Sequence, residues 1–202
     1  MKKYCISMLA LAISLLSYCK KPETNKSCQF TYNATNSKLG WVAYKYVEKL
    51  GVKGTFKEIT VNGAKEANSI EEAIDGISFS IATSSVDSGV SERDKKIVEH
   101  FFGKMKLGDT IKGKVSEVKL GKANLSLSMN EITRQIPVTY TIENQDTLKV
   151  KLEINVDDWQ AQESVAALNE VCKELHKGKD GVSKLWPDVS ITINSKFDKN
   201  CK

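Results

Sequence analysis

Apolar and polar residues alternate along the chain from residue 28 onward. Around Trp41, for example, Leu39, Trp41 and Ala43 occupy every second position, with Gly40 and Tyr44 on the opposite parity. Successive side chains of a β-strand point to opposite faces, so this alternation predicts strands that are dry on one face. We expect about eight or nine of them. Beyond residues 39–44 they fall at residues 52–56, 59–61, 77–81, 111–118, 125–129, 136–142, 148–154 and 189–193, and the segment 59–61 is one position out of phase with 52–56, as a bulge produces.

The connections between most of these segments are short turns, such as residues 121–123 and 144–146. A parallel return needs a dozen residues or more, so successive strands must run antiparallel. A long meander of half-dry strands leaves exposed edges unless the sheet closes on itself. We therefore predict a mainly β fold, a single antiparallel eight-stranded barrel with two short helices. A barrel of this size has room inside for side chains or for one small ligand.

Two helices interrupt the predicted meander. The first begins at a capping-box outline, in which the hydroxyl of Ser91 is placed to accept from the amide of Asp94. The second covers about residues 161–175, with apolar residues on one face. A weaker turn at residues 69–74 carries another capping outline. Both helices are expected to pack an apolar stripe onto the barrel. The stripes consist of Ile97, Val98, Phe101 and Phe102 in the first helix, and of Val165, Leu168, Cys172 and Leu175 in the second.

The first residues have the form of a secretory signal, because Lys2 and Lys3 precede the apolar stretch 6–16, which is too short to span a membrane. Residues 16–19, Leu-Ser-Tyr-Cys, resemble a bacterial lipobox. We therefore expect a lipoprotein signal peptide at 1–18, a lipidated Cys19, a polar tether at 19–27 and one domain at 28–202. This predicts a periplasmic or outer-membrane lipoprotein of the bacterial cell envelope, held to the membrane through its acyl chains. Tyr18 stands where lipoboxes carry a small residue, and the alternative is an uncleaved or differently cleaved signal with Cys19 a free thiol.

The charge of the chain is mildly positive. Loss of residues 1–18 removes two of the 30 basic residues and none of the 25 acidic ones, which leaves 28 minus 25, or +3. The lysines are scattered among carboxylates with no stripe of arginine and aromatic residues, so we expect no nucleic-acid partner.

No sequence motif for catalysis or metal binding stands out. The two histidines, His100 and His176, have no cysteine or carboxylate nearby at a metal-ligand spacing, and no Gly-x-Ser-x-Gly motif occurs. We expect neither an enzyme, nor a metal, nor a cofactor.

Four ordered segments resemble the YceI-like family of periplasmic lipid-binding proteins, which are lipocalin-like in shape. They are residues 50–56, residues 85–102 with Ser85-Val86-Asp87-Ser88-Gly89 and Arg93-Asp94, residues 129–138, and residues 167–189. The resemblance implies a barrel whose apolar tunnel holds a long isoprenoid lipid, such as a polyprenyl or quinone-like chain. The sequence departs from the family at Lys45, where relatives often have histidine, and at Glu131, where glycine is common.

Parity along the strands selects the side chains that would line such a tunnel. The inward candidates are Leu39, Trp41, Ala43, Phe56, Phe79, Ile81, Val115, Leu127, Met129, Val138 and Tyr140. Lys45 or Arg93 could meet a headgroup at the barrel mouth. In the alternative, the inward residues fill a solid barrel that serves as a scaffold for adhesion or protein contact, Arg93 pairs with a nearby carboxylate, and Asp94 complements the helix dipole.

Three cysteines follow the tether, at positions 28, 172 and 201. In an antiparallel barrel with an even number of strands, the start of the first strand and the end of the last lie side by side, which predicts a Cys28–Cys201 disulfide in an exported protein. Cys172 would stay a buried thiol, and the rival pairing joins it to one terminus. The sequence allows a monomer or a homodimer.

Overall fold

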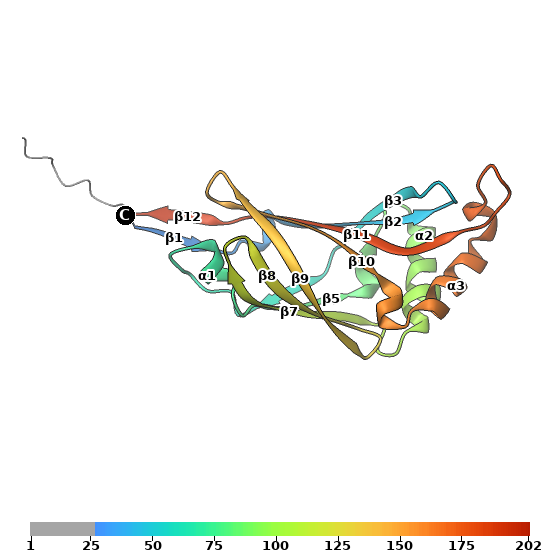
Figure 1. Cartoon of the computed structure of the whole chain (residues 1–202), viewed down its shortest axis with the longest axis horizontal. Coiled ribbons are helices and arrows are strands. Elements are labelled where there is room, and N and C mark those ends of the chain that lie inside the picture. Colours follow the sequence, from blue (N-terminus) through green and yellow to red (C-terminus); the bar gives the residue numbers. More distant parts are fainter. Residues whose placement is uncertain (1–26) are drawn as a thin grey trace, which may run out of the picture.

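The computed structural model describes residues 27–202 as twelve strands and three α-helices, with short 3-10 and π segments (Figure 1). The strands are β1 (Cys28–Thr31), β2 (Ser37–Lys45), β3 (Leu50–Phe56), β4 (Ile59–Asn62), β5 (Ser78–Ala82), β6 (Val86–Asp87), β7 (Thr110–Lys119), β8 (Lys122–Met129), β9 (Ile132–Glu143), β10 (Thr147–Asn155), β11 (Leu185–Lys196) and β12 (Asp198–Cys201). The α-helices are α1 (Ile70–Ile74), α2 (Ser91–Lys96) and α3 (Gln162–Val171).

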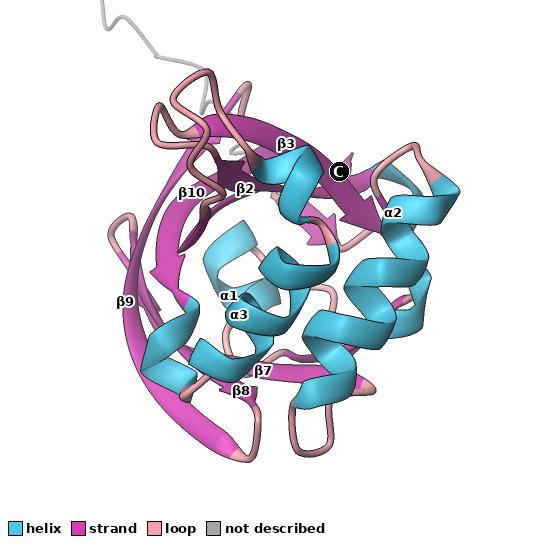
Figure 2. Cartoon of the chain, turned by 90° about the vertical axis from the view of Figure 1, so that its right-hand side faces the viewer, coloured by secondary structure: helices cyan, strands magenta, loops and turns pink. Residues whose placement is uncertain are grey.

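Ten of these strands form one antiparallel sheet, in the order β4-β5-β7-β8-β9-β10-β11-β2-β3-β6. The sheet curls round on itself, as the end-on view in Figure 2 shows. The predicted mainly β, barrel-like fold is thereby confirmed. The sheet has ten strands instead of the predicted eight, because two long strands are each broken into two, and β1 and β12 form a separate two-stranded sheet.

The first broken strand is β3–β4, interrupted at Lys57 and Glu58. The second is β5–β6, interrupted by a 3-10 turn at Thr83–Ser85. Hydrogen bonds across the breaks, from Lys57 N to Ser85 O (3.0 Å) and from Ala82 N to Glu58 O (3.1 Å), keep the two strands side by side. The first half of β3–β4 pairs with β2 and its second half with β5, so this bent strand joins the two edges of the sheet.

Pairing around the ring is incomplete beyond this bend. The ladder between β2 and β3 ends at Trp41 and Gly54, and residues 37–40 of β2 pair only with β11 on their other side. In the part of the chain that the structure describes, no ladder joins these residues to β4. We call the opening between residues 34–39 and residues 57–61 the seam.

Helices cover both ends of the barrel. α2, its continuation through a π turn at Ile97–Phe101, and α3 lie at one end, while the short α1 lies at the other (Figures 1 and 2). Among residues 27–202, no helix combines the length and apolar character needed to cross a bilayer.

The helix starts are partly as predicted. Ser69 Oγ accepts from Glu72 N at 3.1 Å, which confirms the cap before α1. The predicted Ser91 cap is wrong, because the amide of Asp94 donates to Val90 O (3.1 Å) and Ser91 already lies inside the helix. The Asp94 carboxylate instead accepts from Ser88 N at 2.9 Å. It therefore stabilises the turn that precedes α2.

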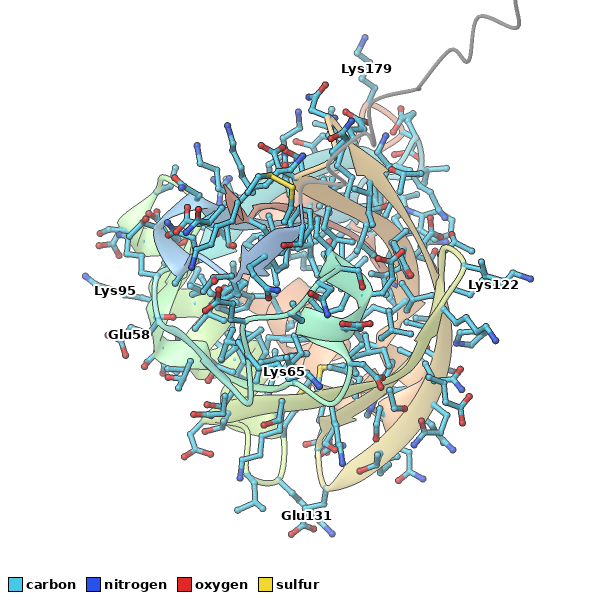
Figure 3. The ribbon with its side chains drawn as sticks, turned by 90° about the vertical axis from the view of Figure 1, so that its left-hand side faces the viewer. Glu58, Lys65, Lys95, Lys122, Glu131 and Lys179 are labelled. Carbon is cyan, nitrogen blue, oxygen red and sulfur yellow. A yellow bond between two sulfur atoms is a disulfide. The ribbon has the colours of Figure 1, made fainter. Side chains whose placement is uncertain are left out.

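The two chain ends of the domain meet in a separate ribbon. β1 pairs with β12, with Cys28 opposite Cys201, and a disulfide joins these two residues (Figure 3, yellow bond). This is the predicted pair, and Cys172 is a buried free thiol. The expected signal peptide, the expected lipidated Cys19 and all of the expected tether except Ser27 lie outside the described residues.

Candidate functional site

A cavity of about 830 Å³ runs through the barrel between the two helical ends. Most strands of the barrel contribute the side chains of one parity to its wall, and these are almost all apolar. All eleven residues selected from the sequence lie in this wall: Leu39, Trp41, Ala43, Phe56, Phe79, Ile81, Val115, Leu127, Met129, Val138 and Tyr140. The period-two pattern therefore identified the inner face of the sheet.

Two glycines give the wall room for large aromatic rings. A Cβ on Gly113 would come within 2.2 Å of Phe79 Cζ, and one on Gly54 would meet Trp41 equally closely. Gly113 faces Phe79, and Gly54 faces Trp41, in the strand register. Each ring lies across the glycine of the neighbouring strand, where any larger residue would push it away.

The helices also contribute to the wall, which the sequence interpretation did not include. The contributors are Ile74 from α1, Ile97, Phe101 and Phe102 from the segment after α2, and Val165 and Leu168 from α3. Phe102 packs edge-on against Phe101, with ring centroids 5.0 Å apart. The helical spacing of these apolar residues could have identified them as part of the wall. The sequence analysis used it only to predict that the helices pack against the barrel.

Tyr140 places one buried polar atom in this apolar wall. The residue is 7% exposed, and its hydroxyl has no hydrogen-bond partner of normal geometry within residues 27–202. Burial raises the pKa of this phenol, and the nearby Glu71 carboxylate raises it further. Tyr140 is therefore a neutral hydroxyl at the α1 end of the cavity.

The structure does not bring Lys45 or Arg93 to the cavity. Lys45 Nζ donates to the carbonyl of Leu175 at 3.0 Å. Arg93 donates from Nε to Ser88 Oγ (2.7 Å) and from Nη2 to Ser88 O (2.8 Å). Within the described residues Arg93 has no ion pair, so neither the headgroup contact nor the alternative carboxylate pair is found, and Arg93 instead holds the turn at Ser88.

Among the described residues that line the cavity, the charged ones are Lys38 and Lys57, one on each side of the seam. The sequence analysis did not select either of them. Lys57 Nζ lies 2.9 Å from Asp87 Oδ2, and this contact raises the pKa of Lys57 and lowers the pKa of Asp87. Lys38 has no ion pair in the described part of the chain.

The cavity reaches the surface at the seam. Four of its lining residues are exposed, Ala34, Thr35, Lys38 and Lys57, and all four lie on the two sides of this opening. The neighbouring Glu58 points outward, away from the barrel (Figure 3). The site is therefore an apolar chamber whose exposed lining residues lie at the seam.

The histidines lie outside this chamber. His176 is buried, with Nδ1 2.9 Å from Asn169 Oδ1. His100 Nε2 lies 3.7 Å from the Glu99 carboxylate. Across residues 27–202, no three histidine, cysteine or acidic side chains lie close enough together to hold a metal ion.

Solved structures share this architecture at low sequence identity. A polyisoprenoid-binding domain from Saccharophagus degradans superposes with a TM-score of 0.60 over 87% of this chain and 99% of that domain, at 12% identity. BcnA from Burkholderia cenocepacia superposes with a TM-score of 0.52 over 81% of this chain and 98% of its own, at 15% identity. No curated protein matches the chain in sequence.

The family assignment comes from the sequence itself. The model of the YceI-like domain matches residues 30–197, which include the whole barrel and its cavity. The chain, with its curled antiparallel sheet and apolar chamber, belongs to the YceI-like domain family.

Proposed function

We propose that this protein binds an isoprenoid-type lipid, polyprenyl or quinone-like, in the barrel cavity and carries or sequesters it without chemical change. The observation behind the proposal is the chamber of about 830 Å³ with its nearly all-apolar wall. Pockets for small molecules commonly enclose about 300–1,000 Å³, so the chamber has the size of a ligand site.

An apolar tail needs no charged contact to be held in such a chamber. A tail that loses about 400 Å² of surface to the wall gains roughly 10 kcal/mol, before the cost of ordering it is subtracted. Burial of the tail is therefore the main source of binding free energy in this proposal. The similar fold of the polyisoprenoid-binding domain supports the same ligand class.

The composition of the wall favours carriage over catalysis. The described lining residues include no histidine, cysteine, aspartate, glutamate or arginine. General acid–base and nucleophilic catalysis often use such groups within reach of the substrate. Lys38, Lys57 and Tyr140 therefore have no histidine, cysteine or carboxylate beside them among the lining residues, which supports a non-catalytic role as part of the proposal.

We propose further that the protein is a lipoprotein of the bacterial envelope, anchored through Cys19. Its first residues support this, as does the position of the chain ends. Cys28 and Cys201 lie together at the α1 end, so a tether attached before Cys28 would hold the barrel by that end. α2, α3 and the loops between them would face away from the anchor.

The rival role is that of a scaffold whose barrel is filled by its own side chains. The cavity does not favour this role, because a filled barrel leaves no such volume.

Binding is tested with the full chain, freed of copurifying lipid and titrated with a neutral polyprenol such as geranylgeraniol. We expect native mass spectrometry to show one bound molecule and tryptophan fluorescence to change, since Trp41 and Trp186 line the cavity. A clean protein mass with no uptake at any polyprenol concentration would reject the lipid-binding proposal. The anchor is tested separately by labelling cells with a fatty-acid analogue, and unchanged labelling of Cys19→Ala would reject it.

A further inference from the structure

We propose that the β7–β8 hairpin docks the barrel on the surface of an anionic phospholipid bilayer. The residues that would contact the bilayer are Leu120 in the turn and four outward-facing lysines of the two strands, Lys112, Lys114, Lys119 and Lys122. We call these five residues the hairpin face. They lie on the outside of the barrel, so docking does not depend on what the chamber holds.

The lysines of the hairpin face point to solvent because the opposite parity of the strands points inward. In β7, Ile111 and Val115 line the cavity, so Lys112 and Lys114 face outward. All four lysines are exposed. Figure 3 shows the side chain of Lys122 projecting away from the barrel.

Two of these lysines oppose each other across the strands. Lys119 and Lys122 are direct partners at the end of the β7–β8 ladder, and like charges in this position destabilise a sheet. Neither ammonium group has an ion pair or a hydrogen bond within residues 27–202. On β10, by contrast, Lys149 Nζ lies 2.5 Å from the Glu143 carboxylate. Anionic groups between Lys119 and Lys122 would offset their repulsion.

The other two lysines of the hairpin face are flanked by small hydroxyl residues. In the register, Lys112 and Lys114 each lie between a serine of β5 and a serine of β8. The four serines are Ser78, Ser80, Ser126 and Ser128. These short side chains supply no negative charge and leave the ammonium groups accessible. Neither lysine has an ion pair in the described part of the chain.

The net positive charge of the domain is concentrated on this hairpin. Residues 110–129 contain four lysines and one glutamate, a net charge of +3. Residues 19–202 also carry +3, so outside the hairpin the basic and acidic residues are equal in number, at 24 each. The one glutamate, Glu117, already accepts from Asn124 Nδ2 at 2.5 Å. An anionic surface is therefore the complementary partner of the hairpin.

Leu120 indicates that this surface is a bilayer. It is 85% exposed, the highest value among the large apolar residues of the described chain, and it follows directly after Lys119 in the turn. At a membrane surface an apolar side chain enters below the headgroups, while neighbouring lysines remain at the level of the phosphates. A soluble polyanion would match the lysines but gain nothing from Leu120. A second copy of the chain would bring like charges together.

The turn of the hairpin lies beside α1, at the end of the barrel where the two chain ends meet (Figure 1). Val118 N donates to Asp75 Oδ1, just after α1, at 3.3 Å. The proposed tether would hold the barrel by this same end. A bilayer bound here would leave α2 and α3 facing away from it.

The test places a tryptophan at position 120 and measures whether it enters lipid. The full chain carries Leu120→Trp together with Cys19→Ala, which removes the proposed acylation site. It is mixed with vesicles of brominated phosphatidylglycerol and phosphatidylethanolamine, or of brominated phosphatidylcholine alone, because bromine quenches tryptophan on contact. We expect quenching by the anionic vesicles at low ionic strength, little quenching by the neutral ones, and recovery of emission as salt is raised. The same chain without Leu120→Trp gives the background of the three native tryptophans.

The lysine pair is tested in this reporter chain. Lys119→Gln/Lys122→Gln should weaken binding to the anionic vesicles about thirtyfold, because each basic residue near an anionic surface strengthens binding about fivefold. Lys149→Gln/Lys151→Gln on β10 changes the net charge by the same amount and is the matched control. It should bind like the reporter chain. Neither double variant should lower the urea midpoint, which shows that both are folded.

Leu107→Trp is the matched control for the tip. Leu107 is also an exposed leucine with positive φ (72% and 49°, against 85% and 51° for Leu120), but it precedes β7 at the opposite end of that strand. Its neighbour Lys106 is paired with Glu131, with Nζ 3.7 Å from Oε2. A tryptophan at position 107 should therefore escape quenching. Residues 1–26 are the same in every variant, so any membrane affinity of their own affects all of them alike.

Three results would each overturn bilayer docking by the hairpin face. They are equal quenching at positions 107 and 120, equal quenching by neutral and anionic vesicles, and unchanged quenching in Lys119→Gln/Lys122→Gln. Binding of dextran sulfate by a chain whose position 120 stays unquenched by vesicles would also overturn it, and would assign the lysines to a soluble polyanion.

Discussion

The indole ring of Trp41 lies across Gly54, its cross-strand neighbour in β3. The two residues face each other in the register, and a Cβ on Gly54 would come within 2.1 Å of Trp41 Cζ2. Trp41 Nε1 donates to Thr55 O at 3.1 Å, one residue beyond the glycine. Trp41 is 8% exposed and forms part of the cavity wall. Glycine is therefore necessary at position 54 because the indole ring packs against it. The backbone at this position does not form a turn.

Replacement of Gly54 by alanine should displace the indole ring. We expect Gly54→Ala to lower the free energy of unfolding by about 1–3 kcal/mol, the usual cost of overpacking, and to change the tryptophan fluorescence of the folded protein. Gly40→Ala in β2 is the control, because its Cβ would meet the Thr192 hydroxyl at 3.0 Å and Gly54 O at 4.0 Å, both farther away than Trp41 is from a Cβ on Gly54. Equal losses of stability in urea denaturation for the two variants would contradict the packing argument.

A larger side chain in the cavity wall should weaken lipid binding without unfolding the barrel. Val138 lies in the cavity wall, and the next residue, Thr139, is exposed on the other face of β9. We expect Val138→Phe to displace about two methylenes of a bound tail, which at about 0.8 kcal/mol each weakens binding about tenfold. Thr139→Phe should bind polyprenol like the wild type in the same fluorescence titration. Unaltered binding by Val138→Phe would show that the tail does not occupy this part of the chamber.

The buried His176 should make the protein less stable in mild acid. Burial lowers the pKa of this imidazole to about 4, with smaller contributions from the positive charges of Lys45 and Lys96. The unfolded chain takes up a proton near the ordinary histidine pKa of about 6.5, but the folded chain does not. The free energy of unfolding should therefore fall as the pH drops from about 6.5 to about 4, by up to about 3 kcal/mol.

Urea midpoints measured between these pH values test this slope. We expect it to become shallower in His176→Gln and to persist in His100→Gln, whose side chain lies elsewhere. An unchanged slope in His176→Gln would assign the acid sensitivity to other groups.

The Cys28–Cys201 disulfide closes a loop that contains nearly all of the described chain, with a sequence separation of 173 residues. In the chain-entropy model, loss of a disulfide that closes so long a loop lowers the free energy of unfolding by at most roughly 4 to 5 kcal/mol. We expect Cys28→Ser/Cys201→Ser to unfold at a correspondingly lower urea concentration than the oxidised wild type. Reduced wild type should behave like the double variant, and a wild type that is equally stable oxidised and reduced would refute this contribution.

Cys172 provides an independent check on the same fold. Its side chain is buried, so a thiol reagent should fail to label the native oxidised protein and should label one cysteine of the domain after unfolding. Peptide mapping without reduction should recover Cys28 linked to Cys201. A linkage of Cys172 to either terminal cysteine would contradict the structure.

The alternation of apolar and polar residues along the strands was sufficient to predict which side chains face the interior of the barrel. Every inward residue selected from the alternation, from Leu39 to Tyr140, lines the cavity, because side-chain direction in a strand is fixed by the local backbone. The Cys28–Cys201 pairing was also predictable, since an even number of antiparallel strands returns the chain to its starting end. Neither inference needed contacts between particular side chains.

The seam and its charges were decided only by the tertiary structure. The opening exists because β4 bends away from β2 after Glu58, and its two sides are formed by residues 34–39 and 57–61, which are distant in sequence. Lys38 and Lys57 look like other surface lysines in the sequence, whereas Lys45 and Arg93 looked like headgroup ligands until the structure showed their backbone partners. Side-chain direction follows from local backbone geometry, but the position of a charge relative to an opening depends on strands that meet only in the folded chain.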